Sequence, residues 1–548
     1  MTTPSPDIAG VGAMAATPYS HDNVRRGVLH YLLGRGMSAA AGFLTVILLV
    51  RHMEVAAYAA YTAILGFCVL AGMLSGLGME RALTRFIPEG VMQHPGLPLR
   101  RFIWWTSAVR MAILLLLVCI LYAFWPALAE RFAGLAMVPK FPLALAAVLA
   151  SNAMFQLFSA VMQAMVQQKN LTRILVVQWA GRLVLVLAIL SGGTGITLEQ
   201  ALWLMAVPDG IGTVILAWTI HKCLRTPPAS TKHEQLQERD ENDPWPPWQQ
   251  VGKLSLNNYG YNLLAALPQG SSMIILAAAL LAAPFVAVYG FYINLIERFR
   301  QYLPLQFMLN LAEPVLIASY IRDRDFARLC HHGRLLYKLN LLLLLPALAW
   351  LGAVAVPMTH ILTGGKYTEH AWILPLLIAQ IAVGSHATIL QIIINAIGKS
   401  GILTVSGCSA LVAMMLAIGL VLFSGEYSWL VVAPLVYEMV NNLAAVTLLG
   451  KNGWPYDLQW RFHAKLLLAT AGAWAGALFA CAQIASPLGQ VLLAGVVVAA
   501  LFCLSIALLR VVEPGELQSL RGILNRKNGQ DHAPDGSAVS QRGVNREG

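Results

Sequence analysis

Charged residues are scarce in this chain. Asp, Glu, Lys and Arg together make up 11% of its 548 residues, against about 25% in an average soluble domain. Apolar residues make up 58%. The sequence offers no set of amphipathic helices that would cover so large an apolar interior from water. These shortages exclude an ordinary soluble protein and indicate a membrane protein.

Cysteine is also scarce, and none of the seven cysteines shows the spacing of metal ligands. All seven lie in apolar runs or in segments that we predict to be cytosolic. The paired histidines His331 and His332 are flanked by Arg328 and Arg334, which suits a membrane interface. We therefore expect cysteines that pack without disulfides, no metal site and no cofactor.

Apolar runs long enough to cross about 30 Å of hydrocarbon recur along the whole sequence. They predict an all-α polytopic membrane protein with about fourteen transmembrane helices. The predicted spans are 28–50, 58–79, 103–125, 141–165, 172–192, 200–220, 254–282, 286–308, 335–357, 371–396, 402–423, 428–449, 464–484 and 488–510. Residues 1–23 and 513–548 are predicted to be disordered, and no Lys or Arg precedes the apolar patch 8–16, so a signal peptide is not expected.

The 37 Lys and Arg residues are distributed unevenly between the loops. With the loops numbered alternately from a cytosolic N-terminus, 28 lie on the cytosolic side, including four within three residues of a cytosolic span end, and five lie deeper inside spans. The four on the outer side are Arg51, Arg131, Lys140 and Lys366. This bias predicts that both termini are cytosolic. It also explains the net charge of +11 as a topology signal that suits anionic membrane lipids, and not as a nucleic-acid surface.

A polar stretch at 226–250, rich in Pro, Trp and charge, divides six predicted spans from the next six. Three short matches relate the two sets. Residues 55–61 (VAAYAAY) parallel 286–292 (VAVYGFY), Gln163-Ala164 parallels Asn395-Ala396, and Trp203 with Pro208 parallels Trp429 with Pro434. We therefore predict an N-lobe (24–225) and a C-lobe (251–450), related by a pseudo-two-fold along the membrane normal, followed by two C-terminal spans (451–512). Pro208 and Pro434 are candidate gating residues between the lobes; the alternative is a tolerated kink.

Three stretches of the sequence resemble a known family. Residues 32–90 look like the N-terminal region of bacterial polysaccharide repeat-unit flippases of the Wzx type. These belong to the multidrug/oligosaccharidyl-lipid/polysaccharide exporter superfamily. Residues 361–378 and 390–422 are similar to later spans of that family, with a Gly-Lys turn between helices, whereas Ala57 replaces an expected glycine.

The resemblance implies a two-lobed carrier in the bacterial inner membrane that works by alternating access. Its cargo would be an oligosaccharide on undecaprenyl pyrophosphate, moved from the cytosolic to the outer leaflet for exopolysaccharide, O-antigen or capsule synthesis. A polysaccharide polymerase and a chain-length regulator would be its protein partners.

Eight charged residues lie well inside the predicted spans, away from the span ends, where a lone charge facing lipid costs at least about 3 kcal/mol. We interpret the arginines as a basic cavity for a phosphate-bearing lipid headgroup, because the guanidinium donates bidentate hydrogen bonds and stays charged. The acids support them or bind a coupling ion. The candidate phosphate ligands are Arg35, Arg110, Arg182, Arg298 and Arg300, and the acids are Asp209, Glu297 and Glu438.

Each of these charges also has a structural explanation. Glu297 and Arg300 share a helical face and can neutralise each other; Arg298 is turned away from that face, and we expect it to point into the cavity. Arg35 and Arg110 lie near the cytosolic ends of their spans and can snorkel to the headgroups. Asp209 can pair with Arg182.

Three other function classes fit parts of the sequence. A polysaccharide polymerase or ligase needs an outward catalytic platform, but the longest outer loop has about 15 residues and carries no catalytic constellation. A drug exporter of the same superfamily predicts an acidic cavity, contrary to the excess of arginine. A scaffold needs no buried charge. We therefore expect a transporter and not an enzyme.

Overall fold

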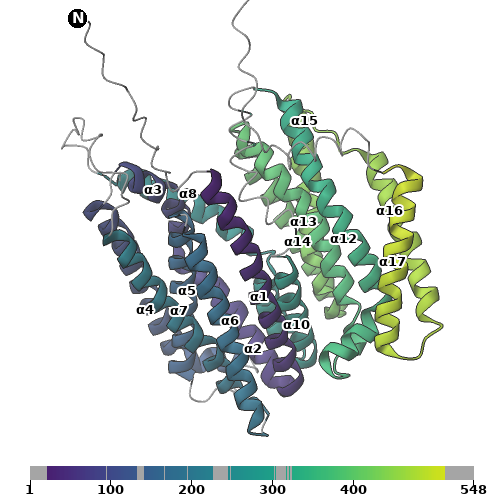
Figure 1. The fold of residues 1–548 in the computed structure, drawn as a ribbon, viewed down its shortest axis with the longest axis horizontal. Helices are drawn as coiled ribbons and strands as arrows, with labels where there is room; N and C mark the ends of the chain where they lie inside the picture. Colours follow the sequence, from purple (N-terminus) through teal and green to yellow (C-terminus); the bar gives the residue numbers. More distant parts are fainter. Residues whose placement is uncertain are drawn as a thin grey trace, which may run out of the picture.

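The computed structural model describes residues 21–93, 96–131, 141–165, 167–193, 195–225, 245–246, 248–300, 303, 316, 320 and 324–511. Within these residues the chain is helical and contains no strand, which confirms the all-α prediction. The helices form two groups side by side in Figure 1: most of the first half of the chain lies at the left and α12 to α17 lie at the right, whereas α8 lies beside α3 at the left.

The first half contains seven helices. They are α1 (His21–His52), α2 (Val55–Gly76), α3 (Met79–Gln93), α4 (Leu97–Arg131), α5 (Phe141–Ala164), α6 (Gln168–Ser191) and α7 (Leu198–Arg225). Six of them coincide with predicted spans. The additional helix, α3, is amphipathic: Leu83, Phe86 and Ile87 are buried, while Arg85 is exposed. It packs on α5, α8 and α4 at the end of the bundle where α4 begins.

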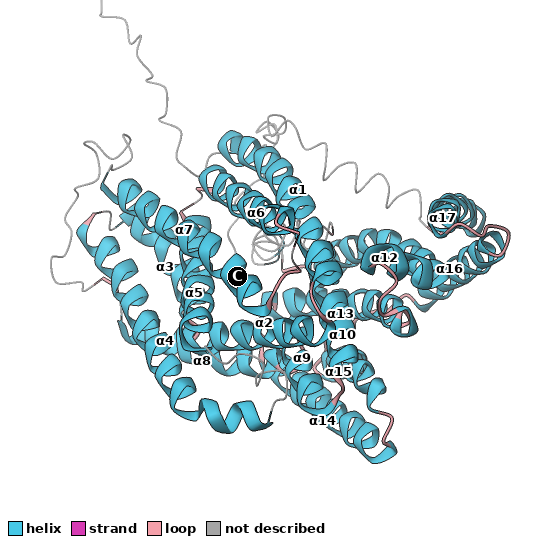
Figure 2. Ribbon diagram, turned by 90° about the horizontal axis from the view of Figure 1, so that it is seen from below, coloured by secondary structure: helices cyan, strands magenta, loops and turns pink. Residues whose placement is uncertain are grey.

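The second half begins with α8 (Trp248–Ala266), α9 (Gly270–Leu280) and α10 (Ala283–Arg300). It continues with α12 (Phe326–Thr363), the short 3₁₀ helix η2 (Thr368–His370), α13 (Ile373–Ala396), α14 (Gly401–Ser424), η3 (Tyr427–Val432) and α15 (Ala433–Lys451). The two last helices, α16 (Trp460–Cys481) and α17 (Pro487–Leu509), form a separate pair against α12 at the edge of the molecule (Figures 1 and 2).

Eleven helices in the described part of the chain are long and apolar enough to cross a membrane, so the count of fourteen is not confirmed. The three remaining predicted spans differ for physical reasons. The apolar part of α1 is only Gly36–His52. The seventh predicted span is broken into α8 and α9 around Pro268. Helix α10 has 18 residues and carries Glu297, Arg298 and Arg300 in its last turn.

Contacts between the two halves are reciprocal. Helix α1 packs against α10, α9 packs against α2, and α2 and α10 pack against each other. In the predicted repeat, α1 and α2 are the first and second spans of one copy, and α9 and α10 belong to the first and second spans of the other. Each first span therefore meets the second span of the other copy. The helices approach closely because small residues lie at the crossings: a Cβ added at Gly66 of α2 would lie 2.7 Å from the carbonyl oxygen of Ser271 in α9.

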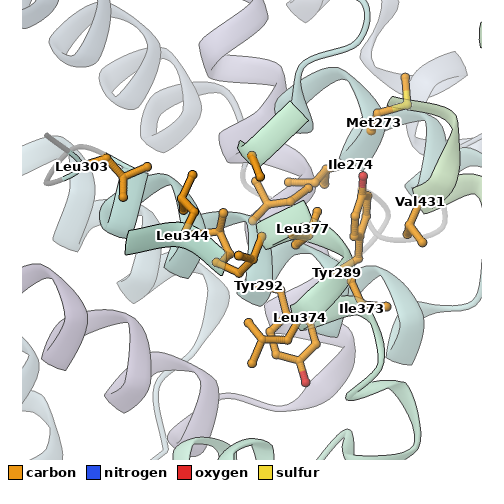
Figure 3. Packing of buried hydrophobic residues seen from close by; sticks show 14 of the residues in the cluster. Met273, Ile274, Tyr289, Tyr292, Leu303, Leu344, Ile373, Leu374, Leu377 and Val431 are labelled. Atoms are coloured by element: carbon orange, nitrogen blue, oxygen red, sulfur yellow. The ribbon is translucent and has the colours of Figure 1, made fainter. Parts of the chain in front are cut away.

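The tyrosines of the matched segments 55–61 and 286–292 occupy equivalent buried positions. Tyr58 and Tyr61 in α2 are 1% and 4% exposed, and Tyr289 and Tyr292 in α10 are 1% and 0% exposed. Tyr292 forms a hydrogen bond of 2.6 Å with Thr359 of α12. Figure 3 shows Tyr289 and Tyr292 among the buried apolar side chains Met273, Ile274, Leu344, Ile373, Leu374 and Leu377. The sequence repeat thus marks the core at the junction of the two halves.

The start of α8 packs on the first half of the chain. The ring of Trp248 lies 4.6 Å from that of Trp105 in α4, and the ring of Trp245 lies 5.7 Å from that of Phe102. The predicted linker 226–250 therefore ends in residues that contact α4, and its part 226–244 lies outside the described residues, as do 1–20 and 512–548.

Candidate functional site

Arg298, in the last turn of α10, forms a contact between the two halves of the chain. Its guanidinium carbon lies 3.8 Å from the ring centroid of Trp179, which belongs to α6 in the first half. A guanidinium over an indole ring is attracted by the negative face of the ring. Trp179 is 8% exposed. Gly42 of α1 borders both side chains, since a Cβ there would lie 3.7 Å from Cδ of Arg298.

A second guanidinium contacts the same indole from within the first half. Arg182 lies one helical turn after Trp179, with its guanidinium carbon 4.2 Å from the ring. It also forms an ion pair with Asp209 of α7, and both side chains are buried. Asp209 accepts further hydrogen bonds from Gln178 and, at 3.5 Å, from Asn152. The predicted pairing of Asp209 with Arg182 is confirmed.

The two candidate gating prolines differ in their helical context. Pro208 is buried inside α7, directly before Asp209. Pro434 is buried in the first turn of α15, after η3. A proline inside a helix removes a hydrogen bond, whereas the first turn has no bond to lose. Neither proline lines the cavity described next, and their gating role stays a prediction.

A cavity of about 710 Å³ lies mainly within the second half, and one of its walls is formed by α2. Its charged lining residues, within the described part of the chain, are Arg300, Glu297 and Glu438. Amide side chains supply much of the remaining polar surface: Gln269, Asn294, Gln380, Gln391 and Asn441. Amides donate and accept hydrogen bonds, as sugar hydroxyl groups do. The cavity as described holds two acids and one arginine, so it is not the basic cavity that we expected.

Helix α10 directs its charges to two different places. Glu297 and Arg300 face the cavity, and their side chains are 3.4 Å apart, which confirms the predicted pair. They are 51% and 44% exposed. Arg298 does not belong to the lining of this cavity, because it is turned toward Trp179. Arg298 therefore does not line this cavity, and the expectation that it points into a central cavity between the halves stays a prediction.

Glu438 enters the cavity from α15 opposite a glycine. A Cβ added at Gly384 of α13 would lie 3.3 Å from the Glu438 carboxyl carbon. A larger residue at position 384 would thus press on the carboxylate. The absence of a side chain there gives Glu438 its room beside the cavity.

Arg110 does not snorkel to the membrane surface. Its side chain is 0% exposed. It donates hydrogen bonds of 2.7 Å to Glu80 of α3 and 3.1 Å to the carbonyl of Gly72 in α2. Arg110 thus joins α4 to α2 and α3 and stabilises the first half. The side chain of Arg35, the remaining predicted ligand, lies outside the described residues.

Trp179, Gln178 and Glu80 are the polar-site residues that the sequence analysis missed. Trp179 and Gln178 precede Arg182 by three and four positions, the spacing that places side chains on one helical face. That spacing is a usable signal. Glu80 carried none, because it lies just beyond the predicted end of the second span.

Comparisons with family models and with solved structures show what this chain is similar to. Residues 24–241 match the model of a family described as "Polysaccharide biosynthesis protein". No curated protein sequence matches the chain. The solved structure of the lipid II flippase MurJ in an inward closed conformation is similar, with a TM-score of 0.62 and 12% identity over 88% of this chain and 98% of that one.

A multidrug resistance transporter of the MATE family, in an inward-facing conformation, is similar with a TM-score of 0.56. It is 11% identical and covers 77% of this chain and 98% of its own. Identities this low show the fold alone. The predicted resemblance is confirmed at the level of fold: the chain shares the fold of this flippase and this MATE transporter, and residues 24–241 match the polysaccharide biosynthesis family.

Proposed function

We propose that this protein is a flippase for a lipid-linked oligosaccharide carried on undecaprenyl pyrophosphate. It moves its cargo from the cytosolic to the outer leaflet of the bacterial inner membrane by alternating access between its two halves. The match of residues 24–241 to a polysaccharide biosynthesis family and the fold shared with a lipid II flippase support the cargo class. The polymer made from this cargo is exopolysaccharide, O-antigen or capsule, with a polymerase and a chain-length regulator as partners.

The observation that carries the proposal is the position of Arg298 between the halves. Its guanidinium is attached to the second half and rests on Trp179 of the first. A pyrophosphate is recognised well by arginine, which stays charged and donates two parallel hydrogen bonds. Arg298 is partly exposed, and we propose that its guanidinium binds the pyrophosphate of the cargo. Arg300 lies on the same helix beside the amide-lined cavity, which suits the sugars.

Two of the other predicted ligands have positioning roles in this proposal. Arg110 and Arg182 are buried and paired with Glu80 and Asp209. The direction of transport agrees with the membrane potential, because an anion leaving a negative interior gains about 2.3 kcal/mol per charge per 100 mV.

The test is complementation of a flippase-null strain, with the protein quantified in the membrane. We expect Arg298→Ala to abolish polymer export at normal abundance, and Arg298→Lys to retain part of it, because the charge survives and the bidentate fork is lost. Arg173→Ala is the matched control, since Arg173 is an exposed arginine on α6. Full export by Arg298→Ala at wild-type abundance would show that the phosphate site lies elsewhere.

A drug exporter is the second candidate, and the cavity carboxylates favour it. Glu297 and Glu438 face the same cavity, and a cationic compound would be attracted to them. Expression in an efflux-deficient strain separates the two functions. Resistance to a cationic dye that is lost in Glu438→Gln, without complementation of export, would support the exporter. A polymerase is disfavoured because both similar structures are transporters.

A further inference from the structure

Two cations on the predicted outer side of the membrane connect the two halves. Arg51 is in the last turn of α1, and Lys366 lies in the turn after α12. They are two of the four Lys and Arg residues that the sequence places in outer loops. Lys and Arg are disfavoured in outer loops, so the presence of Arg51 and Lys366 there needs a physical explanation.

Lys366 binds the end of α1. Its ammonium donates hydrogen bonds to the carbonyl oxygens of Val50 at 3.3 Å, Arg51 at 2.9 Å and Met53 at 3.1 Å. The last carbonyls of a helix have no partners within the helix and carry the negative end of its dipole. Lys366, from the second half of the chain, therefore caps a helix of the first half.

Arg51, from the first half of the chain, caps the C-terminus of α12 in the second half. Its Nε donates a hydrogen bond of 3.0 Å to the carbonyl of Leu362, and its Nη2 donates to the carbonyl of Ile361. Both carbonyls belong to the last turn of α12. Each half thus supplies the cation that caps a helix C-terminus of the other half.

The turn that carries Lys366 is held in a defined shape. Gly364 and Gly365 have φ of 70° and 89°, in the region that glycine adopts without strain. The N–H of Gly365 donates to the carbonyl of His360 at 3.0 Å, and the buried hydroxyl of Thr363 donates to the carbonyl of Lys366. Lys366 is consequently presented to α1 by a closed turn, and partial burial lowers its pKa from the ordinary value of lysine.

We infer that Arg51 and Lys366 form a reciprocal latch that holds the predicted outer side closed and opens when the halves separate on that side. All five hydrogen bonds cross between α1 and the end of α12, so separation of the halves there breaks them together. Opening of the opposite side leaves them intact. The latch residues act on helix ends and not on cargo. This inference rests on the alternating access of the proposed function and is independent of what is transported.

The test is the distance between the halves on the outer side, measured by single-molecule fluorescence on purified protein in lipid nanodiscs. Labels are attached through unnatural amino acids at two exposed residues, Glu199 in the first turn of α7 and Glu426 directly before η3. The variants are Lys366→Met, Arg51→Met and their combination. Lys399→Met is the matched control, because Lys399 is an exposed lysine in the Gly398–Lys399 turn at the far end of α13.

We expect Lys366→Met to raise the ratio of wide to narrow distances by about fivefold or more, the size of effect expected for a cation at a partly buried helix terminus. Arg51 is exposed, so Arg51→Met should raise this ratio by about two- to fivefold. The double variant should raise it further, Lys366→Arg should restore much of the narrow population, and Lys399→Met should leave it unchanged. Wild-type distances in both single variants would overturn the inference. Arg51 is exposed, so Arg51→Met remains decisive if Lys366→Met does not fold.

The measurement uses no cargo, so its outcome is separate from the cargo assignment. If the complementation test contradicts the cargo assignment while Lys366→Met opens the outer side, the latch inference still holds. Unchanged distances together with normal complementation by Lys366→Met would remove the latch and leave the flippase.

Discussion

The buried ion pair between Arg182 and Asp209 allows a quantitative prediction. Replacing Asp209 with Ala removes the acceptor that Arg182, Gln178 and Asn152 share. The Arg182 side chain is 3% exposed and would keep its charge without a carboxylate. Its contact with Trp179, 4.2 Å away, compensates only in part. Breaking a buried pair by removing one partner costs about 3–5 kcal/mol, against a typical stability of about 5–15 kcal/mol.

We therefore expect Asp209→Ala to lower the thermal midpoint strongly and to reduce the amount of folded protein. The assay is size-exclusion chromatography of a fluorescent fusion after heating in detergent. The double variant Arg182→Met with Asp209→Leu should recover much of the loss, because apolar groups of similar volume replace a buried pair at little cost. Arg300→Gln is the control, since its pair with Glu297 is 44% and 51% exposed.

Two results would contradict this reasoning. One is a wild-type midpoint for Asp209→Ala, and the other is a double variant no more stable than the single one. The double variant also decides the role of the pair in transport. If it folds and complements export, the pair is structural. If it folds without export, Asp209 takes part in transport, as an ion-coupling residue would.

The remaining predictions concern three other parts of the molecule. Glu297→Gln should change membrane abundance and export little, because an exposed ion pair contributes at most about 1 kcal/mol; immunoblots and complementation measure both. Gly66→Leu should reduce the amount of folded protein by pushing α2 away from Ser271 of α9, whereas Gly36→Leu, with no atom within 4 Å of an added Cβ, should not. Reporter fusions after Asp240 should be active only with a cytosolic reporter, since 28 Lys and Arg lie on that side; activity of a periplasmic reporter there would refute the topology.

Much of the fold followed from the hydrophobic pattern because a span must satisfy its own backbone hydrogen bonds as a helix. The hydrophobic pattern did not predict a helix that lacks a long apolar run, nor a break inside a predicted span. Helix α3 is amphipathic and short, with Pro88 inside it, so it resembles a polar loop when only apolar runs are counted. The break between α8 and α9 at Pro268 lies inside a stretch that was counted as one predicted span, 254–282.

The repeat was visible in the sequence because its matched segments form the junction of the halves. The tyrosines at 58, 61, 289 and 292 are all buried there. The two prolines were a weaker signal, because equal positions in the sequence gave different helical contexts. Pro208 interrupts a helix, whereas Pro434 begins one.

The site was harder to predict because charge pairing depends on which helices face each other. Glu297 with Arg300 and Asp209 with Arg182 were within reach of spacing arguments. Arg298 was not, since nothing in its own helix shows that Trp179, more than a hundred positions earlier, supplies a ring for it. The latch between Arg51 and Lys366 depends on two helix ends that meet only in the folded chain.

Three of the five arginines inside the predicted spans are paired with acids in the structure, so the surplus of arginine does not by itself indicate a basic cavity. The sequence places five arginines and three acids in the predicted spans, which suggested a basic cavity. Glu80 of α3 adds a fourth acid and neutralises Arg110. Asp209 pairs with Arg182, Glu297 pairs with Arg300, and Glu438 brings a further negative charge to the cavity that Arg300 lines. Arg298, which stacks on Trp179 between the halves, is the proposed contact for the anionic cargo, and a single substitution there is the most discriminating test of that proposal.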